Sequence, residues 1–234
     1  MTAFWTCRVL AVLATLAAMC GQQAAAQIAF PIAAPQFAPG DAWTFKLSDA
    51  WLGQETGRQT MAFISRWGNQ WAFQTERNDG IGYRFRTDED LSVCQRDRQT
   101  GEDGCNGYLH FPLDEHYSHR YAGIVGAAGH EVYEGQCQAD GTEPVTVPAG
   151  RFDTLKIVCK GFWSQTGRGN ATGRYDVTLW YAPAAKWAVK TLTVRYQGGG
   201  GKYQMSPDYK RLSELSELTV SRPDASQSTV PTAK

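Results

Sequence analysis

The fold is decided by the stretch Val145-Thr146-Val147-Pro148-Ala149-Gly150-Arg151-Phe152, which runs directly into Asp153-Thr154-Leu155-Lys156-Ile157-Val158-Cys159. Proline at the second position of the turn Val147–Gly150 has a fixed φ that suits a type I turn, and glycine takes the fourth position. From Leu155 to Cys159 every second residue is apolar and lies on the same side of an extended chain. The stretch therefore predicts an antiparallel β-hairpin.

Two more strands are predicted after this hairpin. Tyr175 to Tyr181 alternates large apolar residues with Asp and Thr, and Pro183 then interrupts the pairing because proline cannot donate to a ladder. The segment from Trp187 to Val194 carries apolar groups on both faces, which is typical of a covered strand. Phe152 is out of phase with Leu155, which predicts a bulge near Asp153 and Thr154.

The rest of the chain carries the same signals. Trp43, Phe45 and Leu47 alternate strictly, and Arg66–Gln70 separates two strand-like runs as a hairpin turn does. Leucines at 212, 215 and 218 have helical spacing, but we expect a final strand there. The predicted fold is all-β, a curved antiparallel sheet or open β-barrel over residues 39–220, with two similar lobes as an alternative organisation.

Several of these motifs resemble a bacterial envelope domain of unknown function. The resemblance is carried by Phe111-Pro112-Leu113, by Val147–Phe152, by Trp180-Tyr181-Ala182-Pro183 with Val189-Lys190, and by the opening strand Pro39–Phe45. Members of that family are similar in fold to the lipoprotein-localisation factors, whose curved sheets form an open barrel. The resemblance spans roughly residues 39 to 195, implies architecture, and supplies no catalytic residue.

The N-terminus has the features of a secretory signal. Arg8 precedes a mostly apolar run from Val9 to Met19, and Ala24-Ala25-Ala26 offers small residues for cleavage before Gln27. We expect a signal peptide at 1–26, an extended lead-in at 27–38 and a disordered tail at 221–234, in a periplasmic or secreted protein. The alternative is a lipid anchor on Cys20.

Net charge and hydropathy limit the classes of partner that the mature chain is expected to bind. Cleavage after Ala26 removes Arg8 and no acidic residue, so the balance of 23 basic and 23 acidic residues becomes a net charge of −1. This value argues against nucleic acid and against capture by an anionic membrane surface. No stretch of the mature chain is apolar and long enough to predict a transmembrane helix.

The four cysteines of the mature chain are Cys94, Cys105, Cys137 and Cys159. An even number in an exported protein predicts disulfides, and four cysteines allow three pairings. We favour Cys94–Cys105, which closes a polar loop, and Cys137–Cys159, which joins neighbouring strands. A zinc site is the weaker alternative, because no two cysteines have the spacing of a metal knuckle.

Catalytic signals are few. His110, His116 and His119 lie near Asp114 and Glu115, but an extended chain does not bring them together, so we interpret them as surface residues and predict no metal. Nucleophile motifs such as Gly-x-Ser-x-Gly are absent from the sequence, and the cysteines look structural. We therefore expect no enzyme and no cofactor.

Seventeen Trp and Tyr residues in the mature chain either fill a core or line a ligand cavity. The hypothesis is a non-catalytic envelope protein that binds a lipid, another apolar ligand or another envelope component in the concave face of the sheet. The predicted ligand contacts are Leu155, Ile157, Leu179 and Tyr181. The alternative is a structural or protein-interaction domain without a small-molecule ligand, whose edge strands pair with a partner.

We expect the exported chain to begin at Gln27 and to carry no lipid, because Ala24-Ala25-Ala26 fits signal cleavage better than Met19-Cys20 fits a lipid site. Intact mass and N-terminal sequencing of the protein from its own periplasm check this. A diacylated chain starting at Cys20 would contradict it.

Overall fold

The computed structural model describes residues 28–96, 103–125, 131–165, 171–198 and 206–221. The expected signal peptide and the tail beyond 221 lie outside these residues. Within them the chain is all-β, as predicted. No helix in the described ranges is long and apolar enough to cross a bilayer.

The described residues form twelve strands and one short 3-10 helix, η1. They are β1 (Ala42–Asp49), β2 (Glu55–Trp67), β3 (Gln70–Arg77), β4 (Gly82–Thr87), β5 (Val93–Arg96), β6 (Asp103–Asn106), β7 (Ser118–Val125), β8 (Glu131–Val147), β9 (Gly150–Gln165), β10 (Ala171–Ala182), η1 (Pro183–Ala185), β11 (Trp187–Gly198) and β12 (Ser206–Thr219).

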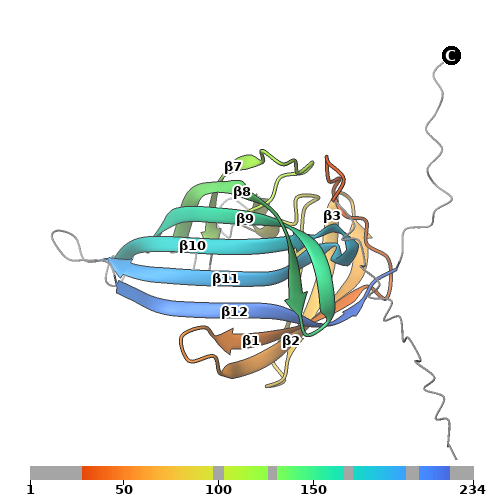
Figure 1. Cartoon of the computed structure of the whole chain (residues 1–234), viewed down its shortest axis with the longest axis horizontal. Coiled ribbons are helices and arrows are strands. Elements are labelled where there is room, and N and C mark those ends of the chain that lie inside the picture. The colour runs from red at the N-terminus through yellow and green to blue at the C-terminus, as the bar shows by residue number, and fades with distance from the viewer. Residues whose placement is uncertain (1–27, 97–102, 126–130, 166–170, 199–205, 222–234) are drawn as a thin grey trace, which may run out of the picture.

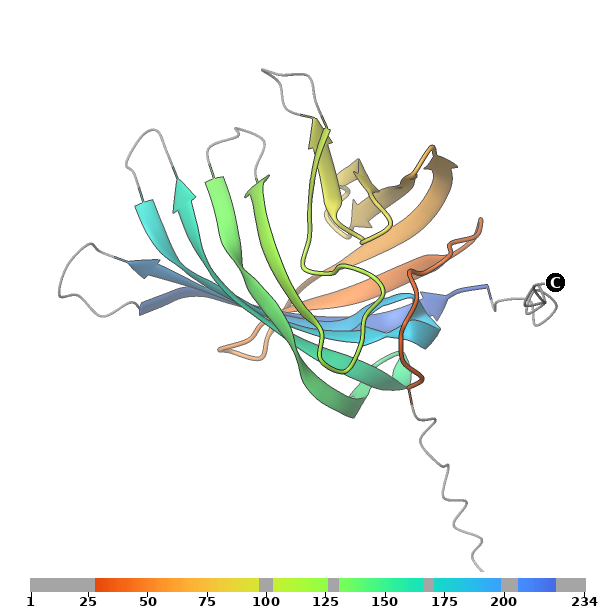
Figure 2. The same ribbon diagram turned by 90° about the horizontal axis from the view of Figure 1, so that it is seen from above.

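All twelve strands belong to one antiparallel sheet in the order β6-β5-β4-β3-β2-β1-β12-β11-β10-β9-β8-β7. Strands β1 to β6 form one meander and β7 to β12 a second, and the two join where β1 pairs with β12. The sheet bends into an open trough (Figures 1 and 2). This is the predicted open barrel, with β6 and β7 at its two free edges.

Local turn chemistry explains where the hairpins lie. The β8–β9 loop is the predicted Pro148-Ala149 pair, and the β2–β3 loop is Gly68-Asn69, where Gly68 has a φ of 61°. At the β10–β11 connection, Pro183 begins η1 and Lys186 follows in the left-handed region. These turns confirm the hairpin positions expected from the sequence.

The bulge predicted near Asp153 and Thr154 lies instead on the partner strand. Pairing of β8 with β9 shifts between Ala139 and Thr142, where Gly141 has a φ of 89° that favours glycine. Strand β9 itself runs without interruption. The one extra residue therefore belongs to β8, where Gly141 accepts the irregular backbone at little cost.

The predicted final strand is confirmed as β12, and its helix-like leucine spacing has a structural cause. Leu215 pairs with Phe45, and Leu218 pairs with Trp43, although three positions separate the leucines and two separate their partners. Ser216 is the extra residue of this bulge, and its hydroxyl donates to the Thr44 carbonyl oxygen at 3.0 Å. The bulge lets both leucines pair with residues on the same face of β1.

The segment that connects β6 to β7, residues 107–117, runs through the hollow of the trough from one edge strand to the other (Figure 2). We call it the link. Its Leu113 exchanges two backbone hydrogen bonds with Ile32 of the lead-in, at 2.7 and 2.9 Å. The link and the lead-in together cover part of the concave face.

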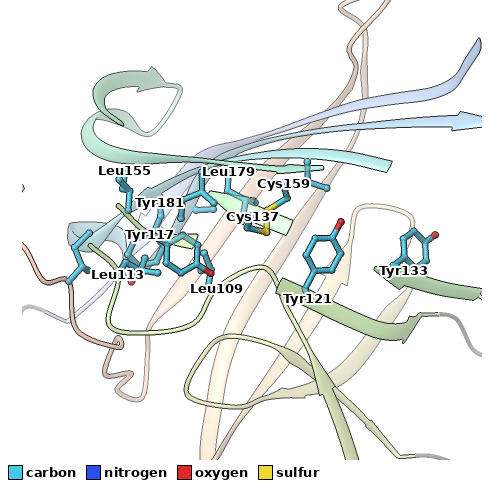
Figure 3. Packing of buried hydrophobic residues seen from close by; sticks show 14 of the residues in the cluster. Leu109, Leu113, Tyr117, Tyr121, Tyr133, Cys137, Leu155, Cys159, Leu179 and Tyr181 are labelled. Atoms are coloured by element: carbon cyan, nitrogen blue, oxygen red, sulfur yellow. A yellow bond between two sulfur atoms is a disulfide. The ribbon is translucent and has the colours of Figure 1, made fainter. Parts of the chain in front are cut away.

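Two clusters of buried side chains form the core. The first lies under the link and includes Leu109, Leu113 and Tyr117 together with Leu155 and Tyr181 (Figure 3). The second is rich in aromatic rings and centres on β1 to β3, with Phe37, Trp43, Phe63, Trp71 and Phe73 among its members. Ring centroids of Phe37 lie 5.1 to 5.8 Å from those of the other four.

Both predicted disulfides are present. Cys94 pairs with Cys105 across β5 and β6, and Cys137 pairs with Cys159 across β8 and β9. Each joins two residues directly opposite in an antiparallel pair. The loop closed by Cys137 and Cys159 spans 22 residues, a length worth roughly 3 kcal/mol in the chain-entropy account.

Asp41 joins the segments that flank β1, β11 and β12 in the middle of the sheet. Its side chain is fully buried and pairs with the Lys186 ammonium at 2.8 Å. It also accepts hydrogen bonds from the backbone N–H groups of Ala38 and Ser221 and from the Ser221 hydroxyl. Burial alone raises the pKa of Asp41, but these hydrogen bonds outweigh burial, so its pKa lies below the usual value.

We expect Asp41→Asn to lower the free energy of unfolding at neutral pH by about 3 kcal/mol, because it leaves the Lys186 charge buried without a counter-ion. The folded pKa of Asp41 is depressed, so its contribution is full above the unfolded value of about 4 and is lost as the pH falls through the folded pKa. The gap between wild type and variant in urea unfolding should therefore narrow in acid.

Asp153→Asn is the matched control, since no ion pair of Asp153 is seen with any described residue and its side chain is half-buried. It should change stability by less than about 0.5 kcal/mol. Equal losses in both variants would contradict the role given to Asp41.

Candidate functional site

The four predicted ligand contacts lie side by side on the concave face. Leu155 and Ile157 come from β9, and they pair with Tyr181 and Leu179 of β10. All four side chains are buried. The exposed fraction is 0% for Leu155 and Ile157, 1% for Tyr181 and 7% for Leu179. The alternation read from the sequence therefore gives their direction correctly.

The space above these four residues is filled. Leu109, Leu113 and Tyr117 of the link belong to the same buried cluster (Figure 3), and the Phe111 ring lies 5.5 Å from that of Tyr181. The Tyr117 hydroxyl is fixed by donating to the Tyr108 carbonyl oxygen at 2.8 Å. The role of the four predicted residues as ligand contacts stays a prediction. None of them lines the groove described next.

An open groove of about 490 Å³ lies on the concave face of the other half of the sheet. We call it the β1–β12 groove, because those two strands cross its floor. It is lined by Phe45, Leu47, Gln59, Met61, Thr75, Tyr83, Arg84, Phe85, Val93, Cys94, Trp187, Ala188, Thr191, Arg211 and Ser213. Its volume falls in the range of about 300–1,000 Å³ that is usual for small-molecule sites.

The walls of the groove come from strands that are far apart in sequence. Met61 pairs with Thr75 and Thr75 with Tyr83, so β2, β3 and β4 each give one side chain to a single row. On the other side, Leu47 pairs with Ser213, and Ser213 with Thr191. Strict alternation along these strands aims all of these side chains at the concave face.

Polarity changes along the floor of the groove. On β12 the inward residues run from Arg211 through Ser213 to the fully buried Leu215, and on β1 Leu47 is followed by Phe45. Arg211 is exposed and forms no ion pair with any described carboxylate, although its guanidinium lies 5.8 Å from the Tyr209 ring. One end of the groove is therefore cationic and the other apolar.

The residue opposite Arg211 in register is Asp49, whose carboxylate is engaged elsewhere. Its Oδ1 accepts hydrogen bonds from the backbone N–H groups of Trp51 at 2.8 Å and Leu52 at 3.0 Å. Among the fifteen lining residues two are arginines and none is acidic. The groove thus combines apolar walls with an excess of positive charge.

A second hollow, of about 530 Å³, lies on the convex face of β7 to β9. Its sides are formed by Arg120 and Lys160 on one row and by Glu134 and Phe162 on the next. Between them Gly161 has no side chain, and a Cβ there would lie 2.4 Å from the Tyr121 hydroxyl oxygen on the concave side. This hollow is a dip between two rows of side chains.

The histidines and acidic residues of 110–119 do not converge on one point. His116 is exposed beside Glu115, and Asp114 accepts the His116 backbone N–H. His110 stacks on His119, with ring centroids 5.3 Å apart. Burial and the neighbouring His110 lower the pKa of His119, so it is neutral at physiological pH.

Asp90 is the partner of His110 that sequence reasoning missed. Its carboxylate lies 2.7 Å from His110 Nδ1 and accepts the Phe111 backbone N–H at 2.7 Å. Asp90 lies in the connection between β4 and β5. Its two contacts fasten the beginning of the link to this connection.

One group of metal-ligand types does come together in the described part of the chain, formed by Asp88, Cys94 and Cys105. Both cysteines are consumed by their disulfide, so neither can supply the thiolate that a zinc site needs. Burial raises the pKa of Asp88 despite its hydrogen bonds from the Ser92 and Asp90 backbone. This group is better explained as disulfide and turn structure.

Comparison with known protein families finds no matching family model, and comparison with curated proteins finds no match. Among solved structures, a candidate lipoprotein from Parabacteroides distasonis has a TM-score of 0.45 at 13% sequence identity. A candidate exported protein with a YmcC-like fold from Bacteroides fragilis has a TM-score of 0.44, also at 13% identity. Each match covers 80% of this chain and 99% of the other. Similarity at this level carries no argument about function, and the resemblance to the lipoprotein-localisation factors stays a prediction.

Proposed function

We propose that this protein is a non-catalytic, exported binding protein that holds a small apolar ligand in the β1–β12 groove. The observation that carries the proposal is the contrast between the two halves of the concave face. Under the link the inward side chains are buried against Leu113 and Tyr117, whereas the groove beside them keeps a volume of about 490 Å³.

The groove offers a ligand a continuous apolar wall. Phe45, Met61, Phe85 and Trp187 line it, and Phe45, Phe85 and Trp187 also pack against the second buried cluster. Walls held by a packed core are largely pre-formed, so binding does not have to order them. Each square ångström of apolar surface that a ligand buries there contributes about 25 cal/mol before association costs.

Export is supported by two independent features. The N-terminal sequence up to Ala26 has the organisation of a secretory signal, and both disulfides join opposite residues on paired strands. Disulfides of this kind persist in oxidising compartments such as the periplasm. A periplasmic location fits both features.

The non-catalytic part of the proposal is supported by the chemistry of the groove. Its lining holds no histidine, serine–histidine pair or carboxylate that could act as a base. Elsewhere on the concave face, burial raises the pKa of Tyr121 to about 12, and burial also raises that of Tyr181. These phenols stay neutral at physiological pH and suit packing.

A structural or protein-interaction role is the second candidate, favoured by the free edge of β7. This strand pairs with β8 on one side and ends the sheet on the other. An extended segment of a partner could add to such an edge through backbone hydrogen bonds. On this reading the groove would hold no ligand.

We expect the oxidised mature protein to bind N-phenyl-naphthylamine, an uncharged apolar fluorophore, and Thr191→Trp to weaken that binding at least about tenfold. Thr191 is half-buried in the groove lining, and an indole there would occupy the ligand's volume. Fluorescence titration of both proteins measures the effect.

Thr178→Trp is the matched control. Thr178 is also half-buried, lies on the neighbouring strand β10 and faces the opposite side of the sheet, next to Leu192. It should bind the fluorophore as wild type does, with both variants folded by circular dichroism. If wild type binds no fluorophore, the groove proposal fails and the protein-interaction candidate takes its place.

A further inference from the structure

We propose that the ligand of the β1–β12 groove is an amphiphile with an anionic head group, a carboxylate or a phosphate, and that Arg211 positions that head. This inference rests on the proposed function, because it specifies the chemistry of the same site. It is carried by the charge and the polarity gradient of the groove.

Arg211 lines the groove and has no ion pair among the described residues, unlike Lys46, Lys190 and Arg58 on the neighbouring strands. Lys46 and Lys190 both contact Glu214, at 3.4 and 3.5 Å, and Arg58 contacts Glu55 at 2.9 Å. Those pairs need no ligand. The Arg211 guanidinium keeps its five donors available for a bidentate contact with a carboxylate or phosphate.

The position of Arg211 matches a ligand with a polar and an apolar end. It shares a ladder row with Thr193 of β11, and the next row inward contains Ser213 and Thr191. Beyond these hydroxyl groups come Phe45, Met61 and Trp187. A head group at Arg211 therefore places a hydrocarbon chain along the aromatic wall.

Charge decides against the alternative of a cationic amphiphile. Arg84 alternates with the inward Tyr83 and Phe85, so Arg211 is the charged side chain of the lining that faces the groove, and a cationic head would meet like charge there. A neutral amphiphile would leave the guanidinium without a partner. An anionic head is the one class whose charge complements the groove.

The test compares decanoate, decyl phosphate and decanol, which share one chain and differ in the head. Each competes with N-phenyl-naphthylamine for the wild-type protein at neutral pH and low salt. We expect the two anions to bind about five- to tenfold more tightly than decanol. This gain is small for a hydrogen bond to a charged group, because Arg211 is exposed and solvent screens its charge. The advantage should shrink as salt is raised.

Arg211→Gln should remove the advantage of the anions and leave decanol binding within about twofold of wild type. Arg211→Lys, which keeps the charge, should retain part of it. Arg120→Gln on the convex face is the control and should change nothing, because Arg120 is exposed and lies outside the groove.

The outcomes separate this inference from the proposed function. If decanol and both anions bind wild type equally, the groove binds apolar ligands and the role of Arg211 is wrong. If only one of the two anions binds more tightly than decanol, the head group belongs to the class of that anion. If none of the three competes and the fluorophore does not bind, the proposed function itself fails.

Discussion

The buried pair of Asp41 and Lys186 is the interaction on which the open sheet depends. Asp41 precedes β1, Lys186 follows η1, and Ser221, whose backbone and hydroxyl both bind Asp41, follows β12. The Trp43 indole adds a bond to the Ala185 carbonyl oxygen at 2.7 Å. These contacts fix the one seam, β1 against β12, that joins the two meanders, and the groove lies across that seam. Burying a charge pair costs desolvation free energy. Here four hydrogen-bond donors on three segments offset that cost for the Asp41 carboxylate.

The concave face of the sheet is covered on one side and open on the other, and this difference separates the buried core from the candidate site. The link and the lead-in put irregular chain on the β8–β10 side of the trough, and Asp90 and Ile32 hold this covering in place. On the other side Phe37 reaches into the aromatic cluster but leaves the end near Arg211 open. The same inward alternation thus produces a sealed core in one half and a lined groove in the other.

Local chemistry made much of the fold predictable from sequence. Pro148-Ala149 and Gly68-Asn69 mark their own turns, and the disulfides follow from neighbouring strands. The groove could not be predicted in this way, because period-two alternation gives the direction of Leu155 and of Phe45 equally well and does not say which is covered. Coverage depends on the path of the link, which the alternation of the strands does not reveal. The inward direction of Arg211 was also hard to predict. The bulge at Ser216 shifts the alternation by one residue, so counting in twos back from Leu218 assigns Arg211 to the wrong face.

The pairing of β1 with β12 also governs when the protein can finish folding. The first strand begins at Ala42 and its partner ends at Thr219, so a chain threaded across a membrane from its N-terminus exposes one edge of β1 until almost all of it has crossed. Hairpins such as β2–β3 close early from local contacts, whereas this seam must wait for a long loop to be spanned. During that interval the backbone of β1 is an open template for strand addition by other chains. For a chain exported as proposed, completion of the sheet is therefore coupled to the end of translocation.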